Sequence, residues 1–297
     1  MTFHMSLRRK IAIASWSAPK EGNIYGKISM DMGNVLKYVE YLRQTTNEKI
    51  TVTHIVGRAA GLALAQCPDL NGRIFMGTYY PHDTVDLAFL VSLEGGKDLA
   101  KFKICNIDKK TTVEIARELR DGAERLRQGE DQDFERPKGL IKALPTWLIR
   151  QVLFINGYLT GCAGIDVSFL GLKKYPFGSC IITSVGMFGL DEGYAPPTPF
   201  ARVPIYIAIP EIKQRPVAID NKVVIRPMLD ITATIDHRFL DGHRGAMIAK
   251  MMREYIKNPW VMDGLAEPPG NWQESHIDQA PPICDKKGAK DNKAMNA

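Results

Sequence analysis

The stretch LDITATIDHRFLDG, residues 229–242, decides the fold that this sequence predicts. Across 229–236, apolar residues alternate strictly with polar ones, which is the pattern of a β-strand with one buried face. His237 follows this strand directly, and Gly242 permits a tight exit into a helix that we expect over 243–257. We therefore expect a histidine at the end of a buried strand, close to the start of a helix.

The sequence on either side of this stretch contains further strands. We expect strands over 24–32 and 84–92, because both segments are extended runs rich in apolar residues. A hairpin over 218–225 should turn at Asp220 and Asn221, which are residue types that accept tight turns. The strands are therefore spread along the whole chain.

Helices lie between these strands without a regular alternation. One is expected to begin near 35, another covers 53–66 and ends before Pro68, and the clearest follows a capping box at Thr111–Glu114. Neither a glycine-rich nucleotide loop nor an internal repeat is present. The predicted class is α+β.

The composition is that of an ordinary globular protein. Of the 297 residues, 45% are hydrophobic and 24% are charged, so the chain can bury a sizeable core. We expect one domain over 1–261 with an apolar insertion at 136–177, followed by a polar tail at 262–297. The net charge of +6 comes from basic residues mixed with acidic ones. We therefore expect no nucleic-acid partner, whereas a phosphate-rich small ligand fits.

The cysteines and the apolar runs indicate the cellular compartment of the protein. The five cysteines are widely spaced, with no CxxC pair and no histidine at metal-ligand spacing, so we expect reduced thiols and no metal site. The N-terminus lacks the apolar run of a signal peptide, and no run is long enough to span a membrane. These features predict a cytoplasmic protein.

The residues after the strand favour acid–base chemistry. Thiol transfer needs a base of near-neutral pKa, and the imidazole of His237 is such a base. A nearby carboxylate, Asp241, and the charged Arg238 can fix the loop and the imidazole tautomer. A lone histidine at a strand end is more often structural, but the whole pattern is more specific.

Four segments carry a resemblance to a known family. They read DHRFLDG at 236–242, ITSVGMFG at 182–189, NIDKKTTVEIARELR at 106–120 and RPVAIDNKVVIRPML at 215–229. The chain resembles the catalytic domain of the dihydrolipoamide acyltransferase component of 2-oxo acid dehydrogenase complexes, over roughly 8–134 and 178–260. That family is related in fold to chloramphenicol acetyltransferase. The resemblance implies a mixed sheet with flanking helices and a trimeric assembly.

The family's chemistry gives expected roles to the matching residues. His237 would deprotonate a thiol of coenzyme A or dihydrolipoamide, and the thiolate would attack the thioester directly, without an acyl-enzyme. Thr183 stands where the family usually has a serine that stabilises the oxyanion, while Ser184 should face the other way. Asp241 would orient the site and Arg238 would hold its loop. In the trimer, Thr183 and His237 would come from different chains.

Some segments depart from the family's usual layout. The chain has no room for a lipoyl domain, so we expect no covalently bound lipoyl group and a separate lipoyl-carrying protein, with other 2-oxo acid dehydrogenase components as possible partners. The insertion at 136–177 places Trp147, Val152 and Ile155 on an apolar helical face. That face could pack on the domain or a neighbouring subunit, line a site for a larger acyl chain, or touch a membrane surface.

Three functions are compatible with this reading. The first is transfer of an acyl group between coenzyme A and a dihydrolipoyl thiol on a separate protein. The second is the same chemistry with a different acceptor. The third is a noncatalytic trimeric scaffold of the same fold. The acyl group, the acceptor and the formation of a larger cage are left open by the sequence.

Overall fold

The computed structural model describes residues 22–93, 98–128, 144–166 and 173–270. Its strands are β1 (Asn23–Asp31), β2 (Gly72–Phe75), β3 (Thr78–Pro81), β4 (Leu87–Leu93), β5 (Asp98–Ile104), β6 (Cys180–Ser184), β7 (Ile205–Ile209), β8 (Lys213–Ile219) and β9 (Lys222–Asp236). Its α-helices are α2 (Gly33–Thr46), α3 (Val52–Ala65), α4 (Thr112–Arg127), α6 (Thr146–Gly157) and α7 (Gly242–Lys257). Short helical turns are η2 (Ile107–Lys109), η3 (Tyr158–Cys162), η5 (Gly186–Phe188) and η6 (Pro259–Asp263).

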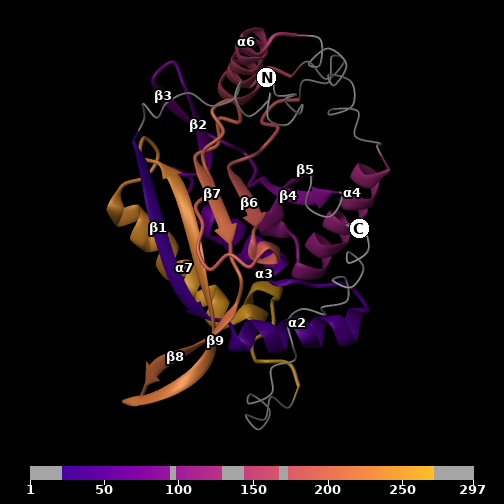
Figure 1. Ribbon diagram of the computed structural model, residues 1–297, viewed down its shortest axis with the longest axis vertical. Coiled ribbons are helices and arrows are strands. Elements are labelled where there is room, and N and C mark those ends of the chain that lie inside the picture. Colours follow the sequence, from indigo (N-terminus) through magenta and orange to yellow (C-terminus); the bar gives the residue numbers. More distant parts are fainter. Residues whose placement is uncertain (1–21, 94–97, 129–143, 167–172, 271–297) are drawn as a thin grey trace, which may run out of the picture.

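A mixed sheet organises the molecule (Figure 1). Within the described residues it has seven strands, six of them in the order β1-β9-β7-β6-β4-β5, and the seventh, β8, pairs with the first half of β9. Strands β4, β6 and β7 run parallel, whereas β1 and β8 pair antiparallel with β9. Strands β2 and β3 form a separate hairpin. The predicted α+β class with a mixed sheet and flanking helices is confirmed.

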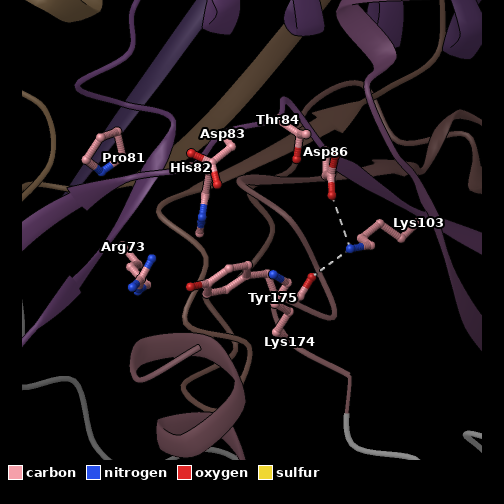
Figure 2. Close-up of a pocket in the computed structure, with 9 residues that line it drawn as sticks. All are labelled: Arg73, Pro81, His82, Asp83, Thr84, Asp86, Lys103, Lys174 and Tyr175. Atoms are coloured by element: carbon pink, nitrogen blue, oxygen red, sulfur yellow. Dashed lines mark hydrogen bonds and ion pairs between the residues drawn. The ribbon is translucent and has the colours of Figure 1, made fainter. Parts of the chain in front are cut away.

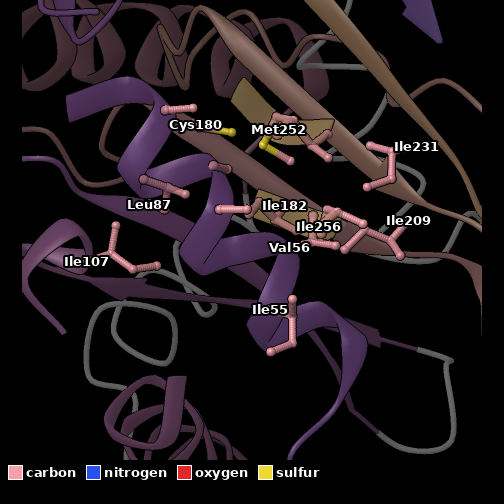
Figure 3. Close-up of a cluster of buried hydrophobic side chains, with 14 of the residues drawn as sticks. Ile55, Val56, Leu87, Ile107, Cys180, Ile182, Ile209, Ile231, Met252 and Ile256 are labelled. Carbon is pink, nitrogen blue, oxygen red and sulfur yellow. The ribbon is translucent and has the colours of Figure 1, made fainter. Parts of the chain in front are cut away.

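The main core lies between the sheet and its helices. Figure 3 shows Ile55 of α3 and Met252 of α7 gathered with Ile182 of β6 and Ile231 of β9. All four side chains are almost completely buried. Burying a side chain of this size contributes about 1.5–3 kcal/mol. The apolar faces of these helices therefore determine how they cover the sheet.

Strand β9 confirms the alternation at 229–236 but differs from the expectation of one buried face. Leu229 and Ile231 lie in the main core, and the polar Asp230, Thr232 and Thr234 on the other face are buried as well. Asp230 accepts hydrogen bonds from Ser29 at 2.5 Å and from Arg215 at 2.6 Å, and Thr232 donates to the Gly193 carbonyl. Asp230 and Thr232 are therefore satisfied by protein partners and not by water, whereas the Thr234 hydroxyl is buried without a described hydrogen-bond partner.

Two local motifs form as the sequence predicts. Thr111 and Glu114 make a reciprocal capping box at the start of α4, with the Thr111 N–H donating to the Glu114 carboxylate at 2.7 Å. Asp220 and Asn221 both have positive φ, at 50° and 60°, which is the conformation of a tight hairpin turn. The hairpin formed by β8 and β9 is therefore confirmed.

The insertion differs from one of its expected arrangements. Helix α6 contacts the body through Ile149 and Gly157, which are buried, whereas Trp147 is 68% exposed and Ile155 is 55% exposed. A Cβ at Gly157 would lie 2.2 Å from the Phe200 carbonyl oxygen, so this close approach decides which side faces the body. Packing of the expected apolar face on its own domain is therefore wrong for the described residues.

The packed body continues slightly past residue 261. Met262 is buried, and the Asp263 carboxylate accepts hydrogen bonds from the Tyr38 hydroxyl at 2.7 Å and from the Thr112 N–H at 2.8 Å. These bonds join η6 to α2 and α4. Most of the expected polar tail, 271–297, lies outside the described residues. No described helix has both the length and the apolar character needed to cross a membrane.

Candidate active site

His237 lies immediately after the last residue of β9, at an edge of the sheet. Its backbone N–H donates to the Gly22 carbonyl at 3.2 Å, which joins the strand end to the segment before β1. The side chain is exposed in the single chain. The imidazole is therefore accessible to a substrate, while a hydrogen bond holds the backbone of His237 in place.

One hydrogen bond orients the imidazole. Nδ1 of His237 lies 2.7 Å from the carbonyl oxygen of Leu240. A carbonyl oxygen only accepts, so Nδ1 carries the proton and donates it. In the neutral ring Nε2 then keeps its lone pair, which is the state that a general base needs. Among the described residues, the partner of Nδ1 is thus a backbone carbonyl and not the carboxylate expected from the sequence.

Arg238 stabilises the loop that follows the strand. Its Nε lies 3.0 Å from both carboxylate oxygens of Asp236, and its backbone N–H donates to Oδ1 at 2.9 Å. The Asp236 N–H in turn donates to the Pro204 carbonyl at 2.9 Å. The arginine therefore contacts the loop as expected, through the aspartate that precedes His237.

Asp241 and Gly242 form the start of α7. The Asp241 carboxylate accepts the Arg244 N–H at 2.9 Å, which is a standard helix cap. This N–H and the nearby charge of Arg244 lower the pKa of Asp241. Gly242 is the first residue of the helix. The structure therefore places Asp241 at the helix terminus, three residues beyond the loop's arginine.

Thr183 lies inside the sheet, on β6. Its side chain is 9% exposed and its hydroxyl donates to no described residue, so the hydroxyl can serve another acceptor. Ser184, the next residue of the strand, is less buried and points to the opposite face, as alternation requires. The turn after it, η5, ends at Gly189 with φ 69°. Met187 and Phe188 on this turn are exposed, at 60% and 53%.

The single chain does not bring Thr183 and His237 together. Thr183 is level with Ala208 of β7, which is level with Thr232 of β9. From Thr232 to His237 the extended strand covers about 16 Å, and two strand spacings add about 10 Å across the sheet. Within one chain these two side chains therefore lie in different parts of the sheet.

The described cysteines are unsuited to nucleophilic catalysis. Burial raises the pKa of all four thiols, those of Cys67, Cys105, Cys162 and Cys180. A raised pKa keeps a thiol protonated at neutral pH, and only the thiolate is a strong nucleophile. No cluster of three or more His, Cys, Asp or Glu side chains in the described ranges could hold a metal ion.

A family model described as 2-oxoacid dehydrogenases acyltransferase (catalytic domain) matches residues 7–136 and 170–263. The chain belongs to this acyltransferase family. The family resemblance predicted from the sequence is thereby confirmed. The matched segments contain Thr183 and the whole 236–242 motif, whereas α6 falls in the unmatched part.

Curated proteins that are similar to this chain are named as acyltransferases. The chain is 25% identical over 213 residues to the dihydrolipoyllysine-residue acetyltransferase component of the acetoin cleaving system of Bacillus subtilis (strain 168), covering 71% of this chain and 42% of the relative. It is 24% identical over 228 residues to the dihydrolipoyllysine-residue succinyltransferase component of the 2-oxoglutarate dehydrogenase complex of Haemophilus influenzae, covering 73% and 45%. The chain thus spans less than half the length of these relatives.

A solved structure supports the fold of this chain. The chain superimposes on a probable dihydrolipoamide acetyltransferase from Listeria monocytogenes 4b F2365 with a TM-score of 0.63 and 17% identity. The superposition covers 86% of this chain and 94% of that one. At this identity the likeness establishes the arrangement of strands and helices, and the chemistry must be argued from the residues.

Sequence reasoning named the side chains of this candidate site but not the backbone oxygen that orients His237. The Leu240 carbonyl, which orients His237, has no signature because every residue carries a carbonyl. Sequence reasoning also missed a pocket beside the β2–β3 hairpin, whose lining residues are scattered between Arg73 and Tyr175. Neither feature follows a spacing that a motif could reveal.

Proposed function

We propose that this acyltransferase moves an acyl group between coenzyme A and a dihydrolipoyl thiol carried by a separate protein. The observation that carries this proposal is the hydrogen bond from Nδ1 of His237 to the Leu240 carbonyl, which leaves Nε2 with a lone pair at the sheet edge. Family membership supplies the thioester chemistry that such a base would serve.

The first step is deprotonation of the incoming thiol. Nε2 of His237 takes the proton, and the resulting thiolate attacks the carbonyl carbon of the thioester. At neutral pH most of a free thiol is protonated, so a positioned base accelerates this step by roughly 10²- to 10⁴-fold. The imidazolium keeps its second N–H on the Leu240 carbonyl throughout.

The second step is collapse of the tetrahedral intermediate. The hydroxyl of Thr183 donates to the oxyanion, and a donor of this kind contributes about 3 kcal/mol to transition-state stabilisation. The carbon–sulfur bond to the first thiol then breaks, and the departing thiolate receives the proton from His237. The acyl group passes directly between sulfurs, which agrees with the protonated, buried cysteines of the described chain.

We further propose that each active site forms between two copies in a trimer or a multiple of three. The separation of Thr183 from His237 within one chain supports this arrangement. The exposed apolar side chains of Met187 and Phe188, on the turn that follows β6, also favour burial against another copy. Coenzyme A and dihydrolipoamide are the substrates, and the other partners are 2-oxo acid dehydrogenase components in a reducing, cytoplasmic compartment.

The test is an acyl-transfer assay with the purified chain. Acetyl-, butyryl- and succinyl-coenzyme A are offered with free dihydrolipoamide or with a separate lipoylated domain, and loss of the thioester is measured. We expect transfer from at least one donor, and a loss of roughly 10²- to 10⁴-fold on His237→Ala. His243→Ala is the matched control, because that exposed histidine lies just beyond the motif.

Two results would contradict the proposal. If His237→Ala kept more than about a tenth of the turnover, another group would be the base. If a folded trimer of the unaltered chain transferred no acyl group to either acceptor, the scaffold function would take its place.

A further inference from the structure

A pocket of about 350 Å³ lies between the β2–β3 hairpin and the segment before β6 (Figure 2). It is lined by Arg73, Pro81, His82, Asp83, Thr84, Asp86, Lys103, Lys174 and Tyr175. Three of these side chains are cationic and two are anionic. A concave site with converging charged groups is suited to a small polar ligand.

Arg73 presents an open edge of its guanidinium to this pocket. Its Nε donates to the Cys162 carbonyl at 2.8 Å, and its guanidinium carbon lies 5.2 Å from the ring centre of Tyr80 and 5.0 Å from that of Tyr175. The two terminal nitrogens donate to no described residue. The guanidinium is therefore held by one bond and two rings, while its other edge can bind two oxygens of a carboxylate or phosphate.

His82 adds an unsatisfied polar atom to the same pocket. Its ring centre lies 4.3 Å from that of Tyr175, and its Nδ1 is buried without a hydrogen-bond partner. Buried polar atoms are rarely left in this state, so a bound group or water is expected to complete the site. Burial, helped by the charge of Arg73, lowers the pKa of His82 to about 4, so this ring carries no charge at neutral pH.

Tyr175, which contacts both of these side chains, is held in a strained backbone conformation. Its φ is 47°, which is unusual for a residue other than glycine. Its N–H donates to the Thr160 carbonyl at 3.1 Å, and its own carbonyl accepts from Lys103 Nζ at 3.1 Å. Such strain persists only where neighbouring bonds impose it, and it concentrates at functional sites.

The balance of charge selects the kind of anion. Lys103 is paired with Asp86 at 3.2 Å, so these two charges largely cancel. Arg73 and Lys174 then face Asp83, which leaves about one positive charge for a ligand. One carboxylate group brings a single negative charge into the pocket, even when the same acid carries a second carboxylate that stays outside it, whereas a phosphate monoester brings about 1.5 to 2. We propose that this pocket binds the carboxylate group of a small organic acid, with Arg73 as its main contact.

The pocket lies at the same sheet edge as His237. Four residues are register partners across β4, β6, β7 and β9, namely Leu87, Cys180, Ile205 and Ile235. The pocket residue Asp86 lies immediately before β4, one position further out. His237 comes directly after β9 at this same end of the sheet. Three strand spacings separate β4 from β9, so the backbones of Asp86 and His237 lie about 15 Å apart. The hairpin also touches the motif loop, since the rings of Tyr79 and Phe239 are 6.0 Å apart.

Two sources could supply such a carboxylate next to the active-site edge. It could be the far end of a dicarboxylic acyl group, or a free organic acid that binds beside the reaction. Binding itself does not depend on the proposed transferase activity, whereas the acyl-group source does. The two sources are therefore separated by experiment.

The first experiment measures binding by calorimetry, with succinate and inorganic phosphate as probes. We expect saturable binding of succinate that is tighter than that of phosphate, and at least roughly tenfold weaker on Arg73→Gln. Lys174→Ala, on the exposed rim, should weaken it less, so the test stands even if the arginine variant folds poorly. Arg253→Gln, an exposed charge change on α7, should leave binding unaltered.

Three results of this first experiment would overturn the proposal. These are the absence of saturable succinate binding, tighter binding of phosphate than of succinate, and equal weakening by Arg253→Gln and by the two pocket variants.

The second experiment compares KM for succinyl-coenzyme A and butyryl-coenzyme A, which differ by the terminal carboxylate. A roughly tenfold higher KM of Arg73→Gln for the succinyl donor alone would assign the pocket to the acyl group. Unchanged values for both donors, with succinate binding lost, would assign it to a free acid. An equal rise for both donors would overturn the carboxylate assignment. If the unaltered chain used neither donor, the transferase proposal would fail while calorimetry still decides about the pocket.

Discussion

The orientation of His237 by the Leu240 carbonyl separates two tasks that the sequence assigns to one side chain. A carboxylate close to a catalytic histidine is expected to fix its tautomer. Here the carbonyl does so, and the Asp241 carboxylate accepts the Arg244 N–H at the start of α7. The role of Asp241 in a single chain is therefore to stabilise a helix start, and this can be measured separately from activity.

We predict that Asp241→Ala lowers the free energy of unfolding by about 1 kcal/mol, because it removes the cap of α7. Asp241→Asn keeps a side-chain acceptor and should cost less than half of that. Urea unfolding of both variants checks the difference. If Asp241→Asn were folded and stable but transferred acyl groups at least tenfold more slowly, the carboxylate would have a further task in the assembled site.

A second residue-scale prediction concerns pH. Burial, with a smaller contribution from Arg43, lowers the pKa of His54 to about 4, whereas an unfolded histidine titrates near 6.5. Between these values the unfolded chain binds a proton that the folded chain does not, so stability falls as pH drops through this window. We expect His54 to account for up to about 2 kcal/mol of the loss in unfolding free energy between pH 7 and 5.

The variant His54→Gln tests this contribution. A glutamine at this position can still accept the Thr51 N–H, as Nδ1 of His54 does at 3.0 Å, so the start of α3 should survive. Its unfolding free energy should depend less on pH over the same window. An unaltered slope would show that His54 is already neutral at pH 5 in the unfolded chain or charged in the folded one. His243→Gln serves as the exposed control.

At the scale of elements, the sequence predicted those features that depend only on neighbouring residues. The alternation at 229–236, the capping box at Thr111 and Glu114, and the turn at Asp220 and Asn221 are all patterns within a few residues. The burial of the polar face of β9 was not predictable, because it depends on what covers Thr232 and Asp230. The orientation of α6 escaped prediction for the same reason.

We predict that Gly157→Ala detaches the end of α6 from the body. The added methyl group would lie 2.2 Å from the Phe200 carbonyl oxygen, and backbone cannot move aside as cheaply as a flexible side chain. Hydrogen exchange should become faster over α6 and η3 while the sheet stays protected. Gly26→Ala, where an added Cβ meets nothing within 4 Å, is the control. Equal exchange in both variants would contradict the close approach.

At the scale of the whole molecule, the sheet register separates the two halves of the proposed site. Thr183 and His237 lie in different parts of one chain, so the site that we propose would need residues from two copies. The sequence could name both residues through the family resemblance. The resemblance also implied that they come from different chains, but the residues alone could not give their separation, because register across three strands depends on the folded sheet.

This separation predicts that two inactive variants restore each other. His237→Ala and Thr183→Val should each be slow alone, the latter by roughly 10²- to 10³-fold. After unfolding and refolding together in equal amounts, about a quarter of the sites would combine an intact threonine with an intact histidine by random assembly. Transfer activity should return to about that fraction of the unaltered protein. Mixed samples no more active than their components would show that both residues act within one chain.

The acceptor for Nδ1 of His237 is a peptide carbonyl, and this has a consequence for genetics. All twenty amino acids would supply the same oxygen at position 240, so no single substitution there deletes it. Leu240 itself is only 3% exposed, and a saturation library at this position would therefore rank residues by size and shape. Isoleucine and methionine should survive selection where aspartate fails. Such a screen would record a packing position and give no sign of the oxygen that orients the base.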